Sequence, residues 1–265
     1  MKTYQIVGGT DIKALPLFSI YRKGDVPAEF YIKQATGETP RVVPDLRPGR
    51  FVRTILLKDG SFSGLASDSG SLLTFVITGT LTLTAGSGQT VKLSPGDLFL
   101  VDKIGASHIS VHASDTCRLV QVGVNPDWPG PEATAQNAGT LTPRVDGKIT
   151  IKRVIKGDDD LAYYREFPEL FSGSPNEWSA PRPVAGLRLM CWEDGFIDWH
   201  PEVVNNLAIF LSGELELEAS GDRVTNVFHA GDICLAQDRT GVGHIDRCRG
   251  VTHIALIVMD TEQLW

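Results

Sequence analysis

The fold can be inferred from two segments of the sequence: Leu73-Thr-Phe-Val-Ile-Thr-Gly-Thr-Leu-Thr-Leu83 and Leu207-Ala-Ile-Phe-Leu-Ser-Gly-Glu-Leu-Glu-Leu217. They match in their apolar positions and in the glycine, and they lie 134 residues apart. An approximate copy of one segment at this distance indicates that the chain contains the same structural unit twice.

Further matching segments extend this internal repeat in both directions. Residues 51–60 correspond to 186–195, residues 93–101 to 228–236, and residues 105–108 to 241–244. The distance between equivalent positions stays close to 135 residues. The repeat therefore covers most of both halves.

Within each half the segments are short, rich in branched apolar residues, and separated by Gly, Asp and Pro. Glu214, Glu216 and Glu218 alternate with Leu215, Leu217 and Ala219, which is typical of a strand with one wet face. We predict an all-β protein with two domains, residues 1–140 and 141–265, joined by a connection over 126–142. Residues 158–171 are the one segment where we expect a short helix.

Composition excludes several classes of function. The net charge is −7 and there is no basic run, so we expect no nucleic-acid partner. The apolar stretch at residues 254–259 is too short to cross a membrane, and residues 1–10 do not resemble a signal peptide. The four cysteines form no CxxC pair, which favours reduced thiols in the cytoplasm.

A motif in the second half carries a family resemblance. His200-Pro-Glu202-Val-Val-Asn-Asn206, with Gly213 seven residues later, has the spacing of the first motif of the cupin superfamily. Ala230-Gly231-Asp232 and Gly241-Val-Gly-His244 have the spacing of the second motif. The chain therefore resembles a bicupin, which implies two tandem jelly-roll barrels, and by family habit a homodimer. Glu202 stands where a second histidine is usual, and Asn206 stands where an acid is usual.

Three residues of this motif have the chemistry of metal ligands. His200, Glu202 and Asn206 differ by even numbers, so on a continuous strand they would face one side. His200, Glu202 and His244 then form a set of two imidazoles and one carboxylate, suited to a divalent transition metal. Fe(II) is our first choice, with Zn, Mn or Ni as alternatives. These three are also our candidate catalytic residues, and Asn206 would contact substrate or bound water.

Other residues are candidates for the substrate pocket: Met190, Trp192, Phe210 and His253. Their apolar and aromatic side chains would suit a small organic substrate, and the residual charge of the metal site would favour an anion. In the first half, Leu72, Asp68 and Ala66 occupy the equivalent ligand positions, and only His108 remains from the second motif. We therefore expect no metal in that half.

Three functions remain open from the sequence. The first is a metal-dependent enzyme that performs O₂-dependent oxidation or metal-assisted isomerisation or lyase chemistry on a small organic molecule. The second is a metal-free isomerase or cyclase with a His–Glu acid–base pair. The third is a non-catalytic bicupin that binds a small molecule.

Overall fold

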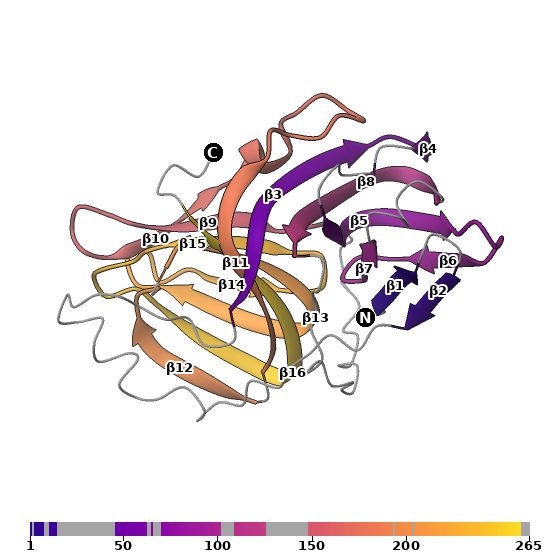
Figure 1. Ribbon diagram of the computed structural model, residues 1–265. Coiled ribbons are helices and arrows are strands. Elements are labelled where there is room, and N and C mark those ends of the chain that lie inside the picture. Colours follow the sequence, from indigo (N-terminus) through magenta and orange to yellow (C-terminus); the bar gives the residue numbers. More distant parts are fainter. Residues whose placement is uncertain are drawn as a thin grey trace.

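The computed structural model describes residue 1 and residues 3–7, 11–14, 46–62, 65, 70–101, 109–125, 148–192, 194–202 and 204–260 (Figure 1). The expected interdomain connection, and with it the boundary at residue 140, lies outside the described residues. Asp68, Ala66 and His108 also lie outside them. The division into two tandem barrels at that boundary therefore stays a prediction.

The described part of the chain is almost entirely β-structure, which confirms the predicted fold class. The strands of the first half are β1 (Thr3–Val7), β2 (Asp11–Ala14), β3 (Arg47–Leu57), β4 (Gly60–Phe62), β5 (Ser71–Thr84), β6 (Thr90–Leu93), β7 (Leu98–Val101) and β8 (Ser110–Val124). Those of the second half are β9 (Ile151–Lys156), β10 (Ala162–Glu166), β11 (Arg182–Trp192), β12 (Gly195–His200), β13 (Asn206–Ala219), β14 (Thr225–Phe228), β15 (Ile233–Gln237) and β16 (His244–Met259).

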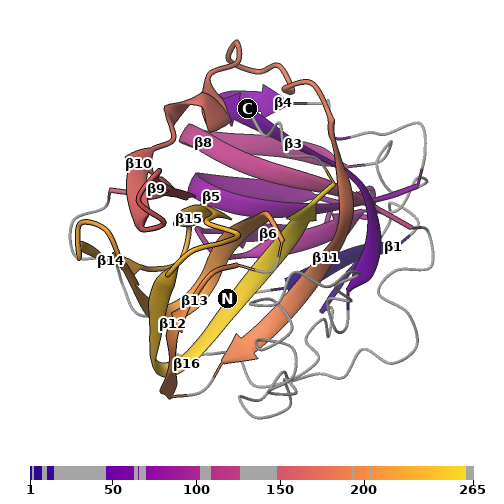
Figure 2. The ribbon, with the colours of Figure 1, turned by 90° about the vertical axis from the view of Figure 1, so that its left-hand side faces the viewer.

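The pairing of these strands reproduces the repeat seen in the sequence. In the first half β5 pairs with β6, β7 and β8, and in the second half β13 pairs with β14, β15 and β16. The parallel pair β1–β7 has its counterpart in β9–β15. Antiparallel pairing of β3 with β11 joins the two halves into one sheet path (Figures 1 and 2).

The two halves share one cluster of buried apolar residues, in addition to a cluster within each half. On β13, Leu207 and Ile209 belong to a cluster that also contains Phe75 of β5. Ala208 and Phe210 point to the other side, into a cluster formed by the second half alone. Side chains of a strand alternate between its two faces, so β5 and β13 each bury one face between the halves. Their unbroken apolar runs fit strands that are covered on both faces.

Two equivalent turns make close contacts between the halves. Gly96 and Gly231 both have positive φ, at +85° and +90°. A β-carbon on Gly96 would lie 2.1 Å from the carbonyl oxygen of Leu211, and one on Gly231 would lie 2.4 Å from that of Ile77. Glycine is therefore needed at both turns for this close approach as well as for the backbone conformation.

The helix expected over residues 158–171 is only partly present, and this expectation was wrong for its first part. Residues Ala162–Glu166 form β10, and a single 3-10 turn covers Pro168–Phe171. Ala162 and Tyr164 are buried while Arg165 is exposed, so the alternation of a strand prevails. Across the described residues, no helix has the length and apolar character required to span a membrane.

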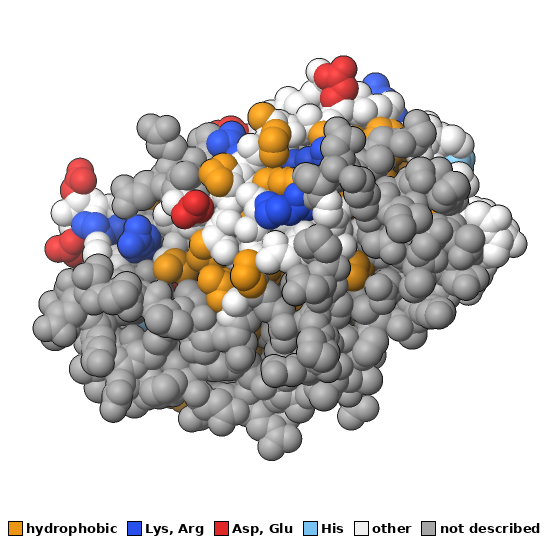
Figure 3. Space-filling view, viewed as in Figure 1, with side chains coloured by type: hydrophobic (Ala, Val, Ile, Leu, Met, Phe, Trp, Pro, Cys, Tyr) orange, Lys and Arg blue, Asp and Glu red, His pale blue; other side chains and the backbone are white. Residues whose placement is uncertain are grey.

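The described side chains of the face in Figure 3 are of mixed character. Basic and acidic side chains both occur there, with hydrophobic side chains between them over the region of β3 and β11.

Candidate metal centre

The end of β12 and the beginning of β16 meet at the candidate site. His200 is the last residue of β12 and is paired with His244, the first residue of β16. Gly243, just before His244, has a φ of +78°, and a β-carbon there would lie 1.9 Å from the carbonyl oxygen of His200. The absence of a side chain at residue 243 thus allows the two histidines to approach each other.

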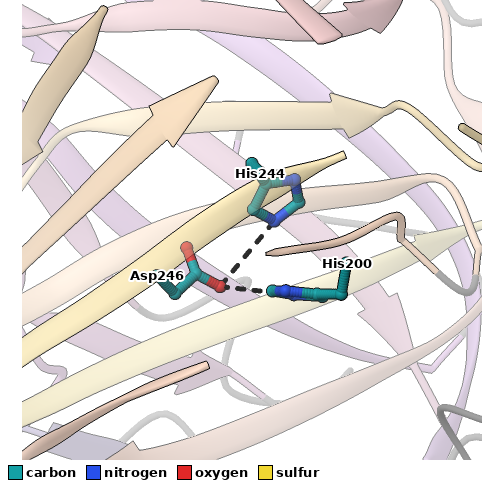
Figure 4. Close-up of side chains that lie close together, drawn as sticks. All are labelled: His200, His244 and Asp246. Carbon is teal, nitrogen blue, oxygen red and sulfur yellow. Dashed lines mark ion pairs between the residues drawn. The ribbon is translucent and has the colours of Figure 1, made fainter. Parts of the chain in front are cut away.

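Asp246 completes a group of three possible metal ligands with these histidines (Figure 4). Its Oδ2 lies 3.7 Å from the Nε2 of His200 and 3.7 Å from the Nε2 of His244. The two imidazole rings have their centroids 4.6 Å apart. Because Asp246 follows His244 by two residues on the same strand, both side chains face the same side.

The orientation of both imidazoles suits metal binding through Nε2. The Nδ1 of His200 lies 2.7 Å from the backbone carbonyl oxygen of Asp198, and the Nδ1 of His244 lies 2.7 Å from the Oδ2 of Asp238. An oxygen acceptor holds a proton on Nδ1, which leaves the lone pair of a neutral imidazole on Nε2. Both lone pairs would then point toward Asp246.

Two polar atoms of the described site residues are buried without a hydrogen-bond partner. Among the described residues, the Nε2 of His244 and the Oδ1 of Asp246 are buried and accept or donate no hydrogen bond. Unsatisfied polar atoms are rare in folded proteins because they lose their hydration without compensation. A divalent cation bound by His200, His244 and Asp246 would compensate this loss, so these residues fit a metal.

Glu202 lies beside this group, and its Oε2 accepts a hydrogen bond of 2.8 Å from the amide of Asn206. Its Oε1 lies 3.8 Å from the Nε2 of His244, and the side chain is 21% exposed. Our assumption of one continuous strand through His200, Glu202 and Asn206 was wrong, because β12 ends at His200 and β13 begins at Asn206. Glu202 nevertheless lies close to both Asn206 and His244, whereas His200 is grouped with His244 and Asp246 instead.

The electrostatic environment shifts the pKa values of the two imidazoles in opposite directions. Burial lowers the pKa of His200, and the charge of His244 lowers it further. Burial also lowers the pKa of His244, but the charges of Asp238 and Asp246 outweigh this effect and raise its pKa to about 10. Burial raises the pKa of Glu202 to about 7, against the opposing influence of His244. In the metal-free protein at neutral pH, His244 is therefore a cation among carboxylates while His200 is neutral.

Asp246 and Asp238 are the two residues that the sequence analysis missed. Asp246 had a signal, because its spacing of two from His244 places it on the same face of a strand. Asp238 had none, since it lies six residues before His244 beyond the turn that contains Gly241 and Gly243.

Three of the predicted pocket residues lie on strands of the second half, Met190 and Trp192 on β11 and Phe210 on β13. Met190 and Trp192 alternate with Leu189 of the shared core, so they face the interior of the second half together with Arg188. Arg188 is only 8% exposed. Phe210 is buried and stacked on Phe228 with ring centroids 4.7 Å apart, which makes it part of the core.

His253 lies on the other face of β16. It shares this face with Ala255 and Ile257, which belong to the core shared by the two halves. The side chain is fully buried, and its Nδ1 is 2.8 Å from the hydroxyl of Ser212. The structure thus separates His253 from His200 and His244.

Burial of His253 predicts acid sensitivity. Burial lowers the pKa of His253 to about 4, and the N-terminal amino group lowers it slightly further. An unfolded histidine titrates near 6.5, so the unfolded state binds this proton first as the pH falls from 6.5 to 4. We expect the free energy of unfolding to fall by about 2 kcal/mol between pH 7 and pH 5 because of this residue.

Urea unfolding at both pH values measures this effect. His253→Gln should reduce the loss of stability between pH 7 and pH 5, while His112→Gln, at an exposed position on β8, should leave it unchanged. An identical loss in the wild type and in His253→Gln would contradict the assignment.

The first half has an apolar residue where the second half has Asp246. Asp246 is paired with Leu217, and its counterpart Val111 is paired with Leu83. Val111 is buried in the core of the first half, and Leu65 and Ile109 pack in the same cluster. The expectation that this half binds no metal remains a prediction.

Comparison with known proteins gives similar folds only. No protein-family model matches the chain, and no curated protein matches it. A cupin 2 conserved barrel domain protein from Leptotrichia buccalis is 14% identical, with 81% of this chain and 85% of that chain covered and a TM-score of 0.40. A protein of unknown function from Pseudomonas syringae pv. tomato, of the DUF861 family, is 13% identical, with coverage of 84% and 86% and a TM-score of 0.39.

An oxalate decarboxylase from Lactobacillus farciminis, in complex with formate, is 15% identical, with coverage of 85% and 84% and a TM-score of 0.30. One of these descriptions, that of the Leptotrichia buccalis protein, names a cupin barrel. At such identities and TM-scores they carry no argument about what this chain binds or does.

Proposed function

We propose that this chain is a metal-dependent enzyme whose second half acts on a small organic anion. The observation that carries the proposal is the convergence of His200, His244 and Asp246, with the Nε2 of His244 and the Oδ1 of Asp246 buried and without hydrogen-bond partners among the described residues. Two imidazoles and one carboxylate with open positions suit Fe(II), which is our first choice, and also Mn, Zn or Ni.

The charge of the site supports an anionic substrate. One carboxylate and two neutral imidazoles would leave a bound divalent ion with a net charge of about +1. The apolar side chains of Met190 and Trp192, which face the interior of the second half, would contact the rest of a small or aromatic molecule.

The chain's own residues suggest two roles in the reaction. When bound, a divalent ion supplies Lewis acidity, and with an O₂-reactive metal also oxidation. Glu202 can accept or release a proton at Oε1, because its pKa of about 7 lies close to neutral pH. Asn206 orients this carboxyl group by donating to Oε2. Both oxidation and isomerisation or lyase chemistry are compatible with these roles.

Metal titration tests the proposal. The wild-type protein, stripped with chelator, should bind one equivalent of Fe(II), Mn(II) or Zn(II), and the double variant His200→Ala/His244→Ala should bind none while it keeps its β-sheet circular dichroism spectrum. Oxygen consumption by the loaded protein with small carboxylates then separates oxidation from isomerisation or lyase chemistry. Absence of binding by the folded wild type would refute the metal-dependent function.

A metal-free acid–base enzyme is the second candidate, and one observation favours it. Glu202 and His244 lie 3.8 Å apart with pKa values of about 7 and about 10, so a carboxyl group and an imidazolium face each other near neutral pH. The metal-free hypothesis predicts that chelator-treated protein turns over substrate, whereas the metal-dependent hypothesis predicts no turnover.

A further inference from the structure

Asp238 connects two parts of the candidate site. It directly follows β15, and its side chain and that of His244 are both fully buried. Its Oδ2 lies 2.7 Å from the Nδ1 of His244. Its backbone carbonyl oxygen accepts a hydrogen bond of 3.2 Å from the backbone N–H of Glu202. One residue therefore holds both the imidazole of His244 and the connection that carries Glu202.

The chemistry of a carboxylate explains what this contact achieves. An ionised carboxylate accepts hydrogen bonds and donates none, so the Nδ1 of His244 must carry the proton. In the neutral imidazole the lone pair then lies on Nε2, the atom that faces Asp246 at 3.7 Å. With the opposite tautomer, Nε2 would carry a proton and could not bind a metal.

The surroundings of Asp238 argue against a purely structural role. Asp232, an aspartate of equal burial, accepts hydrogen bonds from the backbone N–H groups of Thr150 and His229 and so stabilises a turn. The side chain of Asp238 has a hydrogen bond to His244, while its Oδ1 is buried without a hydrogen-bond partner among the described residues. A carboxylate buried in this way costs stability, which indicates a function at the site.

We propose that Asp238 is a positioning residue that fixes the tautomer and the ring orientation of His244, so that Nε2 is presented to a divalent cation. This inference rests on the proposed function, because it assigns a role within the same metal centre. Hydrogen-bond partners of ligating histidines commonly contribute 10–100-fold to metal affinity.

The test uses Co(II) alone as the probe, followed by its visible absorption. Asp238→Asn should weaken Co(II) binding by about 10–100-fold, because an amide can donate to Nδ1 and so favour the proton on Nε2. Asp232→Asn, the matched control, should lower the urea midpoint of unfolding and leave Co(II) affinity unchanged. If Asp238→Asn does not fold, ¹⁵N NMR of histidine-labelled wild type loaded with Zn(II) gives the answer directly, because the Nδ1 of His244 should carry the proton.

The outcomes separate this inference from the proposed function. Failure of the wild type to bind Co(II) or Zn(II) would reject the metal centre itself. Wild-type binding together with equal affinity in Asp238→Asn, or a proton on Nε2 and metal on Nδ1 of His244, would overturn only the role of Asp238.

Discussion

Replacing Gly243 with alanine is expected to abolish high-affinity metal binding at the second half of the chain. A β-carbon at residue 243 would lie 1.9 Å from the carbonyl oxygen of His200 and 2.5 Å from the nitrogen of Pro201. The end of β12 must then move away from the beginning of β16. Since His200 and His244 stand on these two ends, they could no longer share one ion, and we expect a loss of affinity of at least about 100-fold.

A matched control separates the clash from the strain of the backbone. Gly250, on β16, has a φ of +73°, close to the +78° of Gly243, but a β-carbon there would meet nothing within 4 Å. Gly250→Ala should cost only the left-handed conformation, about 1–2 kcal/mol, and should bind metal like the wild type. Isothermal titration with Mn(II) or Zn(II) compares the two variants. Equal affinities in Gly243→Ala and Gly250→Ala would show that the contact with His200 does not shape the site.

The strands could be predicted from the sequence because their information is local. Glu214, Glu216 and Glu218 alternate with apolar residues, and the turn glycines recur at equivalent places in both halves. The core shared by the two halves could not be predicted in this way, because it depends on contacts between distant parts of the chain. The apolar run from Leu207 to Leu211 indicates burial of both faces, but it does not say that the second face is covered by β5 of the other half.

The candidate site could be predicted in part for the same reason. His200 and His244 were found because motif spacing is visible in the sequence. The argument that selected Glu202, a spacing of two residues from a histidine on one strand, applies equally to Asp246. The motif, however, ends at His244, and Asp246 lies two residues after it. Asp238 depends on the turn through Gly241 and Gly243, which folds the chain back, and such a contact follows from tertiary structure alone.

Substitution of the two carboxylates distinguishes the ligand set of the sequence prediction from that of the structure. Asp246→Asn should weaken Mn(II) or Zn(II) binding by at least about 100-fold, whereas Glu202→Gln should weaken it by less than about 10-fold. The reason is geometric, because the Oδ2 of Asp246 is 3.7 Å from both Nε2 atoms. Glu202 approaches only His244, at 3.8 Å, and its other oxygen is held by Asn206.

Stability provides an independent readout for Glu202. Its folded pKa of about 7 exceeds the usual 4.5, so the charged form is disfavoured in the folded state, and this cost is fully present above pH 7 and absent below about 4.5. Glu202→Gln should therefore raise the urea midpoint at pH 8 and have less effect at pH 5. If Glu202→Gln instead lost the metal while Asp246→Asn retained it, Glu202 would be the third ligand, as the sequence motif predicts, and Asp246 would be the neighbouring acid.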